Sequence, residues 1–140
     1  MGQVRDIMEK NVVTIEYNKN ALDAAKILKE KEISFLVIIK DDNPIGIVSE
    51  RDFVRKIVSE NKMASEIPLE SIMSKNFRWV RPDSLIEEAV QKMLNNNIRR
   101  LLVLENDRLV GVITQTDLTS FLRSKLLING TIDSIESEKH

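Results

Sequence analysis

Apolar and polar positions follow the same order twice along the chain. Each copy opens with a short apolar run, continues with apolar residues at helical spacing, and ends with two apolar runs that flank a polar turn. These patterns predict a strand, a helix and a β-hairpin, and a second helix is expected to begin near Ser49 and near Thr114. The predicted strands are residues 12–15, 35–39, 45–48, 77–80, 101–104 and 109–113. Each copy is therefore predicted to be a β-α-β-β-α unit.

The first helix of each copy is indicated by an apolar stripe. In the second copy Ser84 and Glu87 have the spacing of a capping box and predict where the helix begins. The stripe residues are Ala21, Ala24, Ala25 and Leu28 in the first copy and Leu85, Ile86, Ala89, Val90, Met93 and Leu94 in the second. Such spacing places the apolar side chains on one face of a helix, which then needs a partner to cover it.

The two copies also match residue by residue. A shift of 65 residues, which places Gly46 on Gly111 and Asp52 on Asp117, aligns residues 6–54 with the second copy without a gap. One copy alone is small for a stable core, so the two are expected to pack sheet against sheet. The predicted organisation is a first repeat at 1–58, a linker at 59–68, a second repeat at 69–124, and a partly disordered C-terminal extension at 125–140.

Composition excludes several classes of site. The chain has 21 basic and 22 acidic side chains, so no overall positive charge draws it to nucleic acid. It has no cysteine, and its single histidine is His140 at the end of the sequence. A thiolate metal site and a cysteine nucleophile are therefore excluded, and a histidine-based metal site or catalytic triad is not expected. We expect no catalytic residues, no bound metal and no catalytic cofactor.

No part of the chain is predicted to associate with a membrane. The longest apolar run, Phe35–Ile39, is far too short to cross a bilayer, and the N-terminus lacks the apolar region of a secretory signal. The expected location is the cytoplasm.

Two copies of one motif carry a resemblance to a known family. The segments GIVSERDF at 46–53 and GVITQTDL at 111–118 resemble the pattern Gly-x-apolar-Ser/Thr-x-x-Asp-apolar of the cystathionine-β-synthase (CBS) domain. The segments IRRLLVL at 98–104 and DIMEKNVVTI at 6–15 resemble other parts of that domain, so the likeness extends over about residues 4–124.

The resemblance implies a fold and a class of function. It implies an α+β protein in which two β-α-β-β-α repeats pack with pseudo-two-fold symmetry and leave two clefts between them. Such modules commonly bind AMP, ADP, ATP or S-adenosylmethionine and regulate enzymes, channels or kinases. This sequence holds no enzyme domain beside the repeats, so a stand-alone regulatory module that signals to an unidentified enzyme or transporter is expected.

The repeated Ser/Thr-x-x-Asp motif has two interpretations. Ser49 with Asp52, and Thr114 with Asp117, have the spacing of a helix N-cap, and taken alone the residues favour that structural role. A helix N-terminus also suits a phosphate, and an Asp carboxylate can accept the hydroxyls of a ribose. The resemblance implies the second role, with Arg51 and Thr116 beside the motif as further phosphate contacts.

The second copy is the stronger candidate site. Arg99 and Arg100 stand just before a predicted strand, whereas the first copy has the uncharged Ser34 and Phe35 at these positions. Arginine pairs well with phosphate, although a salt bridge or a solvated pair would explain the two residues equally simply. This asymmetry predicts either one full nucleotide site or two sites whose phosphates share the arginine pair. The favoured site centres on Asp117, together with Thr114, Thr116, Arg99 and Arg100.

Weaker candidates lie on other elements. The resemblance implies that adenine meets the first strand of each copy, at Val13 and Thr14 and at Val80 and Arg81, but core packing explains the apolar members equally well. Arg55 and Lys56 are predicted to form a solvated helix face.

A homodimer is expected through the second helices, and a purely structural dimerisation module with no ligand remains the alternative. The apolar residues of those helices that need burial are Phe53, Val54, Ile57, Val58, Leu118, Phe121 and Leu122.

Overall fold

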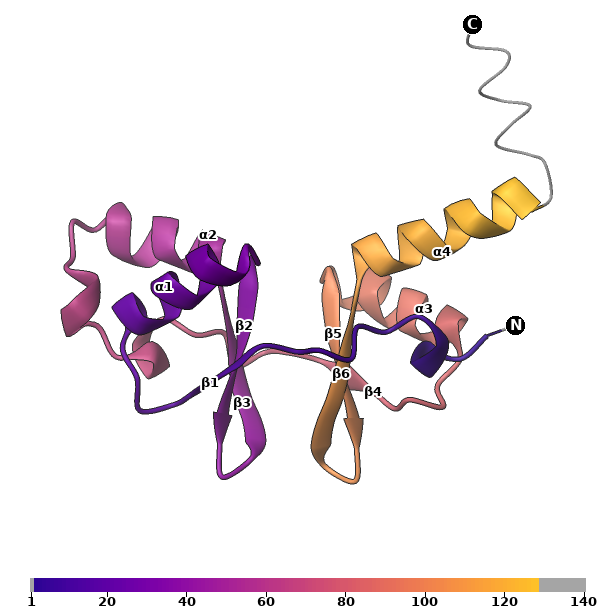
Figure 1. The fold of residues 1–140 in the computed structure, drawn as a ribbon, viewed down its shortest axis with the longest axis horizontal. Helices are drawn as coiled ribbons and strands as arrows, with labels where there is room; N and C mark the ends of the chain where they lie inside the picture. Colours follow the sequence, from indigo (N-terminus) through magenta and orange to yellow (C-terminus); the bar gives the residue numbers. More distant parts are fainter. Residues whose placement is uncertain (1, 129–140) are drawn as a thin grey trace, which may run out of the picture. The chain divides into compact units, whose positions relative to one another are not determined.

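The computed structural model describes residues 2–128 and contains the two predicted copies of the unit (Figure 1). The strands are β1 (Thr14–Glu16), β2 (Phe35–Lys40), β3 (Asn43–Ser49), β4 (Trp79–Val80), β5 (Arg100–Glu105) and β6 (Arg108–Thr114). The helices are α1 (Ala21–Lys31), α2 (Glu50–Phe53), α3 (Ile86–Asn96) and α4 (Gln115–Ile128), with short turns η1 (Val4–Asp6), η2 (Val54–Val58), η3 (Ala64–Glu66) and η4 (Leu69–Ser71). Two three-stranded sheets with helices confirm the predicted α+β class.

The compact units of the structure combine residues from both sequence repeats. One unit, called here the β1–β3 unit, contains residues 11–78 and the hairpin tip 105–109. The other, the β4–β6 unit, contains residues 2–10, 79–104 and 110–128. The segment that opens the first repeat in sequence is thus grouped with the sheet of the second repeat. Residues 129–140, most of the predicted C-terminal extension, lie outside the described residues, whereas 125–128 continue α4.

Each sheet has a parallel pair followed by a hairpin. In the β1–β3 unit β1 pairs in parallel with β2 and β2 pairs antiparallel with β3, with Thr14 opposite Val37. In the β4–β6 unit Trp79 lies opposite Leu102, which is the same register after the shift of 65. The first strands are shorter than predicted: 12–15 is observed as Thr14–Glu16 and 77–80 as Trp79–Val80. Backbone bonding to β2 continues just past the assigned ends of β1, since the Val13 carbonyl accepts from the Val37 N–H at 3.3 Å and the Tyr17 N–H donates to the Ile39 carbonyl at 2.9 Å.

Both hairpins turn on two residues in the left-handed conformation. Asp41 and Asp42 have φ of 52° and 64°, and Asn106 and Asp107 have φ of 52° and 66°. Two consecutive positive φ values define a type I′ turn, which matches the twist of the strands, and Asn and Asp tolerate this conformation better than other non-glycine residues. The polar turns predicted from the sequence therefore have a backbone reason for their composition.

The start of α3 corrects one prediction. Ser84 and Glu87 do not form a capping box; the helix begins at Ile86, and the Glu88 carboxylate accepts a hydrogen bond of 3.4 Å from the Leu85 N–H. Ser84 instead closes a turn, because its N–H donates to the Arg81 carbonyl and its hydroxyl accepts from the Arg81 N–H. Because both groups of Ser84 bond to Arg81 in this turn, the serine does not cap the helix.

A crossing segment completes the core of each unit. In the β1–β3 unit the core of β1, β2, β3 and α1 also contains Leu69, Ile72 and Met73. In the β4–β6 unit the equivalent places are taken by Val4, Ile7 and Met8. Since one β-α-β-β-α copy buries too little apolar surface by itself, these segments supply what is missing.

The two repeated glycines lie where those segments cross a strand. Ile47 exchanges backbone hydrogen bonds of 3.0 and 2.8 Å with Ser74, and Val112 does the same with Glu9. A Cβ atom built on Gly46 would lie 2.6 Å from Met73 Sδ and 3.1 Å from the Ser74 carbonyl oxygen, and one on Gly111 would lie 2.7 Å from Met8 Sδ. A side chain at either position would have to displace the methionine and push the crossing backbone away by a few tenths of an ångström, which glycine avoids.

The second helices of the two copies differ in length. After α2 the chain makes a π-helical turn at η2 and stops at Asn61, whose φ is 53°. The equivalent helix α4 runs for 14 residues from Gln115, and Leu126 stands where the first copy has Asn61. Asparagine adopts the left-handed conformation that ends a helix, whereas leucine continues it. No helix among residues 2–128 has the length and apolar character needed to span a bilayer.

Replacing Gly46 with alanine is expected to lower the free energy of unfolding by about 1–3 kcal/mol, because the added methyl forces the Met73–Ser74 segment away from β3. Chemical denaturation of G46A, M73A and the double variant measures the effect. In the M73A background the same substitution is expected to cost less, since the nearest atom has been removed. Equal costs in the two backgrounds would contradict the proposed contact.

Candidate functional site

The motif of the second copy forms the junction between β6 and α4. The Thr114 N–H and hydroxyl both donate to Asp117 Oδ2, at 2.8 and 3.0 Å, and the Asp117 N–H donates to Thr114 Oγ1 at 3.3 Å. This is a capping box, so the structural role predicted from the spacing is present. It engages one carboxylate oxygen, Oδ2, and both side chains are half-buried.

The motif of the first copy has the same core geometry. The Ser49 N–H and hydroxyl donate to Asp52 Oδ2, at 2.8 and 3.3 Å, at the junction between β3 and α2. The two motifs lie in different units, so each unit carries one Ser/Thr–Asp junction of its own. Arg51 and Thr116, the neighbours predicted as phosphate contacts, are exposed.

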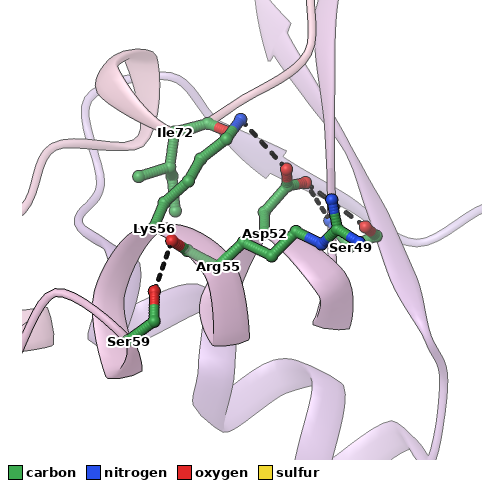
Figure 2. A network of polar contacts seen from close by, with 6 residues as sticks. All are labelled: Ser49, Asp52, Arg55, Lys56, Ser59 and Ile72. Atoms are coloured by element: carbon green, nitrogen blue, oxygen red, sulfur yellow. Dashed lines mark hydrogen bonds and ion pairs between the residues drawn. The ribbon is translucent and has the colours of Figure 1, made fainter.

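A lysine is added to the first motif, and the sequence analysis missed it. Lys56 Nζ lies 3.1 Å from Asp52 Oδ1 and donates to the Ile72 carbonyl at 2.7 Å (Figure 2). The prediction that Lys56 lies on a solvated face agrees with its side-chain exposure of 43%, but its ammonium is also bound to the carboxylate of the motif. The signal was available in the sequence, because an acid followed four residues later by a base is a favourable pair on one helix face.

The predicted arginine pair lies beside the second motif. The Gln115 N–H, the first of α4, donates to the Arg99 carbonyl at 2.8 Å, which fixes the start of β5 against the start of the helix. Arg99 is exposed, and Arg100 is half-buried as the first residue of β5. In the first copy the same backbone bond joins Glu50 to Ser34, which has no charged side chain. The structure thus brings Arg99, Thr114 and Asp117 to one end of one sheet.

The first-strand candidates divide into core and surface residues. Val80 is buried in the core of the β4–β6 unit, and Val13 packs against the core of the other unit. The Arg81 Nε donates to Asp83 Oδ1 at 2.9 Å. That hydrogen bond with the guanidinium holds the pKa of the Asp83 carboxyl below its ordinary value. Thr14 is half-buried at the start of β1.

The arrangement around α4 suits an anionic ribose-containing ligand. The helix start provides positive potential, Asp117 Oδ1 can accept a hydroxyl hydrogen, and the arginines beside it can pair with phosphate. Within residues 2–128 no group of three or more acidic or histidine side chains is arranged to hold a metal ion.

Comparisons with known proteins agree with this geometry. The family model described as CBS domain matches residues 4–59 and 69–124. A solved CBS domain pair of protein MJ0100, in complex with 5′-methylthioadenosine and S-adenosyl-L-methionine, is 28% identical with a TM-score of 0.80, and the match covers 89% of this chain and 98% of that one. A protein with CBS domains from Burkholderia ambifaria is 30% identical with a TM-score of 0.79, covering 86% and 93%.

Relatives in sequence are often longer. An uncharacterized protein of Methanopyrus kandleri is 36% identical over 117 residues, which is 82% of this chain and 60% of the relative. A homoserine O-acetyltransferase of Methanohalobium evestigatum is 33% identical over 121 residues, which is 85% of this chain but 24% of that enzyme. The chain therefore spans between about a quarter and three-fifths of the length of these two relatives.

The family model matches both repeats, and solved CBS domain pairs have a similar fold. Both findings agree with the β-α-β-β-α order, with the two capped junctions and with the glycine at each crossing. The resemblance found in the sequence is confirmed. The chain belongs to the CBS domain family and is a pair of CBS domains.

Proposed function

We propose that this chain is a non-catalytic regulatory module that binds an adenine nucleotide (AMP, ADP or ATP) at the Asp117 junction and transmits its presence to a partner protein. The observation that carries the proposal is the grouping of Thr114, Asp117 and Arg99 at the start of α4. It combines a carboxylate that can accept ribose hydroxyls, a helix N-terminus and an adjacent arginine, which suit the ribose and phosphate of a nucleoside monophosphate.

The adenosine part of the proposal is supported by a relative. The similar domain pair of MJ0100 was solved with 5′-methylthioadenosine and S-adenosyl-L-methionine, both of which contain adenosine. A ligand without phosphate is therefore the second candidate for this chain. The arginines at 99 and 100 favour a ligand with an anionic group, such as a phosphate or the carboxylate of S-adenosyl-L-methionine, over 5′-methylthioadenosine, whose uncharged thioether offers a guanidinium nothing to pair with.

The proposal of a partner protein rests on the regulatory role that is common in this family. A domain pair with no catalytic group can act only by changing its own conformation or its contacts when a ligand binds. An enzyme or a transporter is the proposed recipient of that change, in the same chain or in another one.

We further propose that the chain forms a homodimer through the second helices. Val54 and Val58 remain 59% and 70% exposed, and Leu122 on α4 remains 57% exposed, whereas Ile57 is buried in the core. Apolar side chains at this spacing are covered in a stable assembly, and a second copy of the same helices would cover them.

Asp117→Asn is expected to abolish stabilisation by the nucleotide while leaving the unliganded protein folded, because asparagine keeps an oxygen for the cap but not the carboxylate. Thermal unfolding with AMP, ADP and ATP tests this, since a ligand at a hundredfold its Kd adds about 2.7 kcal/mol. Asp117→Ala, which also removes the cap, should cost a further loss of about 1 kcal/mol without ligand. If millimolar nucleotide leaves the wild-type melting temperature unchanged, the proposal is wrong.

Arg99→Met is expected to weaken AMP about tenfold, as the loss of one charge-assisted bond predicts. Binding of 5′-methylthioadenosine, which has no phosphate, should stay unchanged. Titration calorimetry with both ligands measures the difference, and Arg108→Met, which removes an exposed arginine from the hairpin, controls for net charge. Equal losses for the two ligands would contradict a phosphate contact.

Leu122→Glu is expected to convert the dimer to a monomer, because burying a charge in the proposed interface carries a large desolvation cost. Light scattering after size exclusion measures the mass. The matched control is Leu94→Glu, a leucine that is 70% exposed on α3 and outside the proposed interface. A wild-type monomer at micromolar concentration would exclude the dimer.

A further inference from the structure

The two Ser/Thr–Asp junctions differ in the use of the second carboxylate oxygen. In the first copy Asp52 Oδ2 accepts from Ser49 and Asp52 Oδ1 lies 3.1 Å from the Lys56 ammonium (Figure 2). In the second copy Asp117 Oδ2 accepts from the Thr114 N–H and hydroxyl, the Asp117 N–H donates to Thr114 Oγ1, and Asp117 Oδ1 has no polar contact among the described residues. The oxygen that a ribose hydroxyl would need is thus covered in one copy and available in the other.

The sequence explains why only the first copy has a lysine bound to the carboxylate of its motif. After the shift of 65 residues, Lys56 falls on Phe121, which has no group that could bond a carboxylate. The carbonyl that accepts from the lysine belongs to Ile72, and the equivalent residue of the other copy is Ile7. Both copies therefore have an isoleucine at the acceptor position, but only the first copy has the lysine. The difference therefore depends on a single side chain.

Local structure holds the lysine in place. Lys56 is part of the π-helical turn η2, which follows directly after α2, and its Nζ donates to the Ile72 carbonyl at 2.7 Å. Ile72 is itself buried in the core beside Leu69 and Met73, so this carbonyl is a fixed acceptor rather than a flexible one. A π-helical turn is rare and often lies at a functional position.

Exposure of the pair indicates how strongly it competes with a ligand. The Asp52 side chain is only 15% exposed and that of Lys56 is 43% exposed, so the bond is partly shielded from water. A purely exposed pair would yield to a ligand at little cost, but here the ammonium has a carboxylate and a backbone carbonyl as simultaneous partners. A ribose hydroxyl arriving at Asp52 Oδ1 has to compete with an ammonium that the Ile72 carbonyl holds in place.

From this geometry we infer that Lys56 is a specificity-determining residue that closes the ribose position at Asp52, so the chain offers one open ribose site, at Asp117. The inference deepens the proposed function and rests on it. Lys56 acts as an internal substitute for the ligand, because its ammonium satisfies the carboxylate oxygen that a ribose hydroxyl would otherwise bond.

The test isolates the first site by using Asp117→Asn as background. Calorimetric titration with 5′-methylthioadenosine, and separately with AMP, is expected to show little binding to D117N. Adding Lys56→Met should raise the affinity of D117N about tenfold or more, since one charged hydrogen-bond competitor is removed. 5′-Methylthioadenosine is the primary probe because it has no phosphate, so the loss of a positive charge does not affect it directly.

Lys26→Met in the same background is the matched control, because Lys26 is an exposed lysine of α1 in the same unit. It should leave the affinity unchanged, and thermal unfolding confirms that each variant is folded. The inference is overturned if D117N with Lys56→Met binds no more tightly than D117N alone, or if wild-type protein already binds two equivalent ligands. If neither probe binds the wild type or any variant, the proposed function fails, and the inference falls with it.

Discussion

The close backbone crossing at Gly46 and Gly111 is the constraint on which the rest of the structure depends. At each glycine a segment from elsewhere in the chain pairs with the strand, and its side chains complete the core of that unit. The same strands, β3 and β6, end a few residues later at Ser49 and Thr114. Holding the strand therefore also holds the start of the following helix and the carboxylate that caps it.

Capping and ligand binding need not exclude each other at these junctions. A carboxylate has two oxygens, and the cap uses Oδ2 of Asp52 and of Asp117. The second oxygen is what distinguishes the copies, because Lys56 occupies it in one of them. The two copies of the repeat thus form unequal junctions, through one lysine and through the arginines at 99 and 100, which the first copy lacks.

Most of the local structure could be predicted from the pattern of residues. The hairpins, the second helices near Ser49 and Thr114, and the capping spacing follow from short-range preferences, which act over three or four residues. Strand ends at Thr14 and Trp79 could not be predicted, because they depend on partners far away in the sequence. The start of α3 was misplaced for a similar reason, since Ser84 was bound in a turn that a spacing rule does not see.

By itself, the sequence determined the repeat, its β-α-β-β-α order, the family and the paired acids, since each is a matter of residue type and spacing. Only the tertiary structure decided that residues 2–10 complete the β4–β6 unit and that residues 69–73 complete the β1–β3 unit. Only the tertiary structure showed that the Lys56 ammonium contacts both the Asp52 carboxylate and the Ile72 carbonyl. The physical reason is that an acceptor sixteen residues away becomes a neighbour only after the chain has folded back, and no local pattern records that distance.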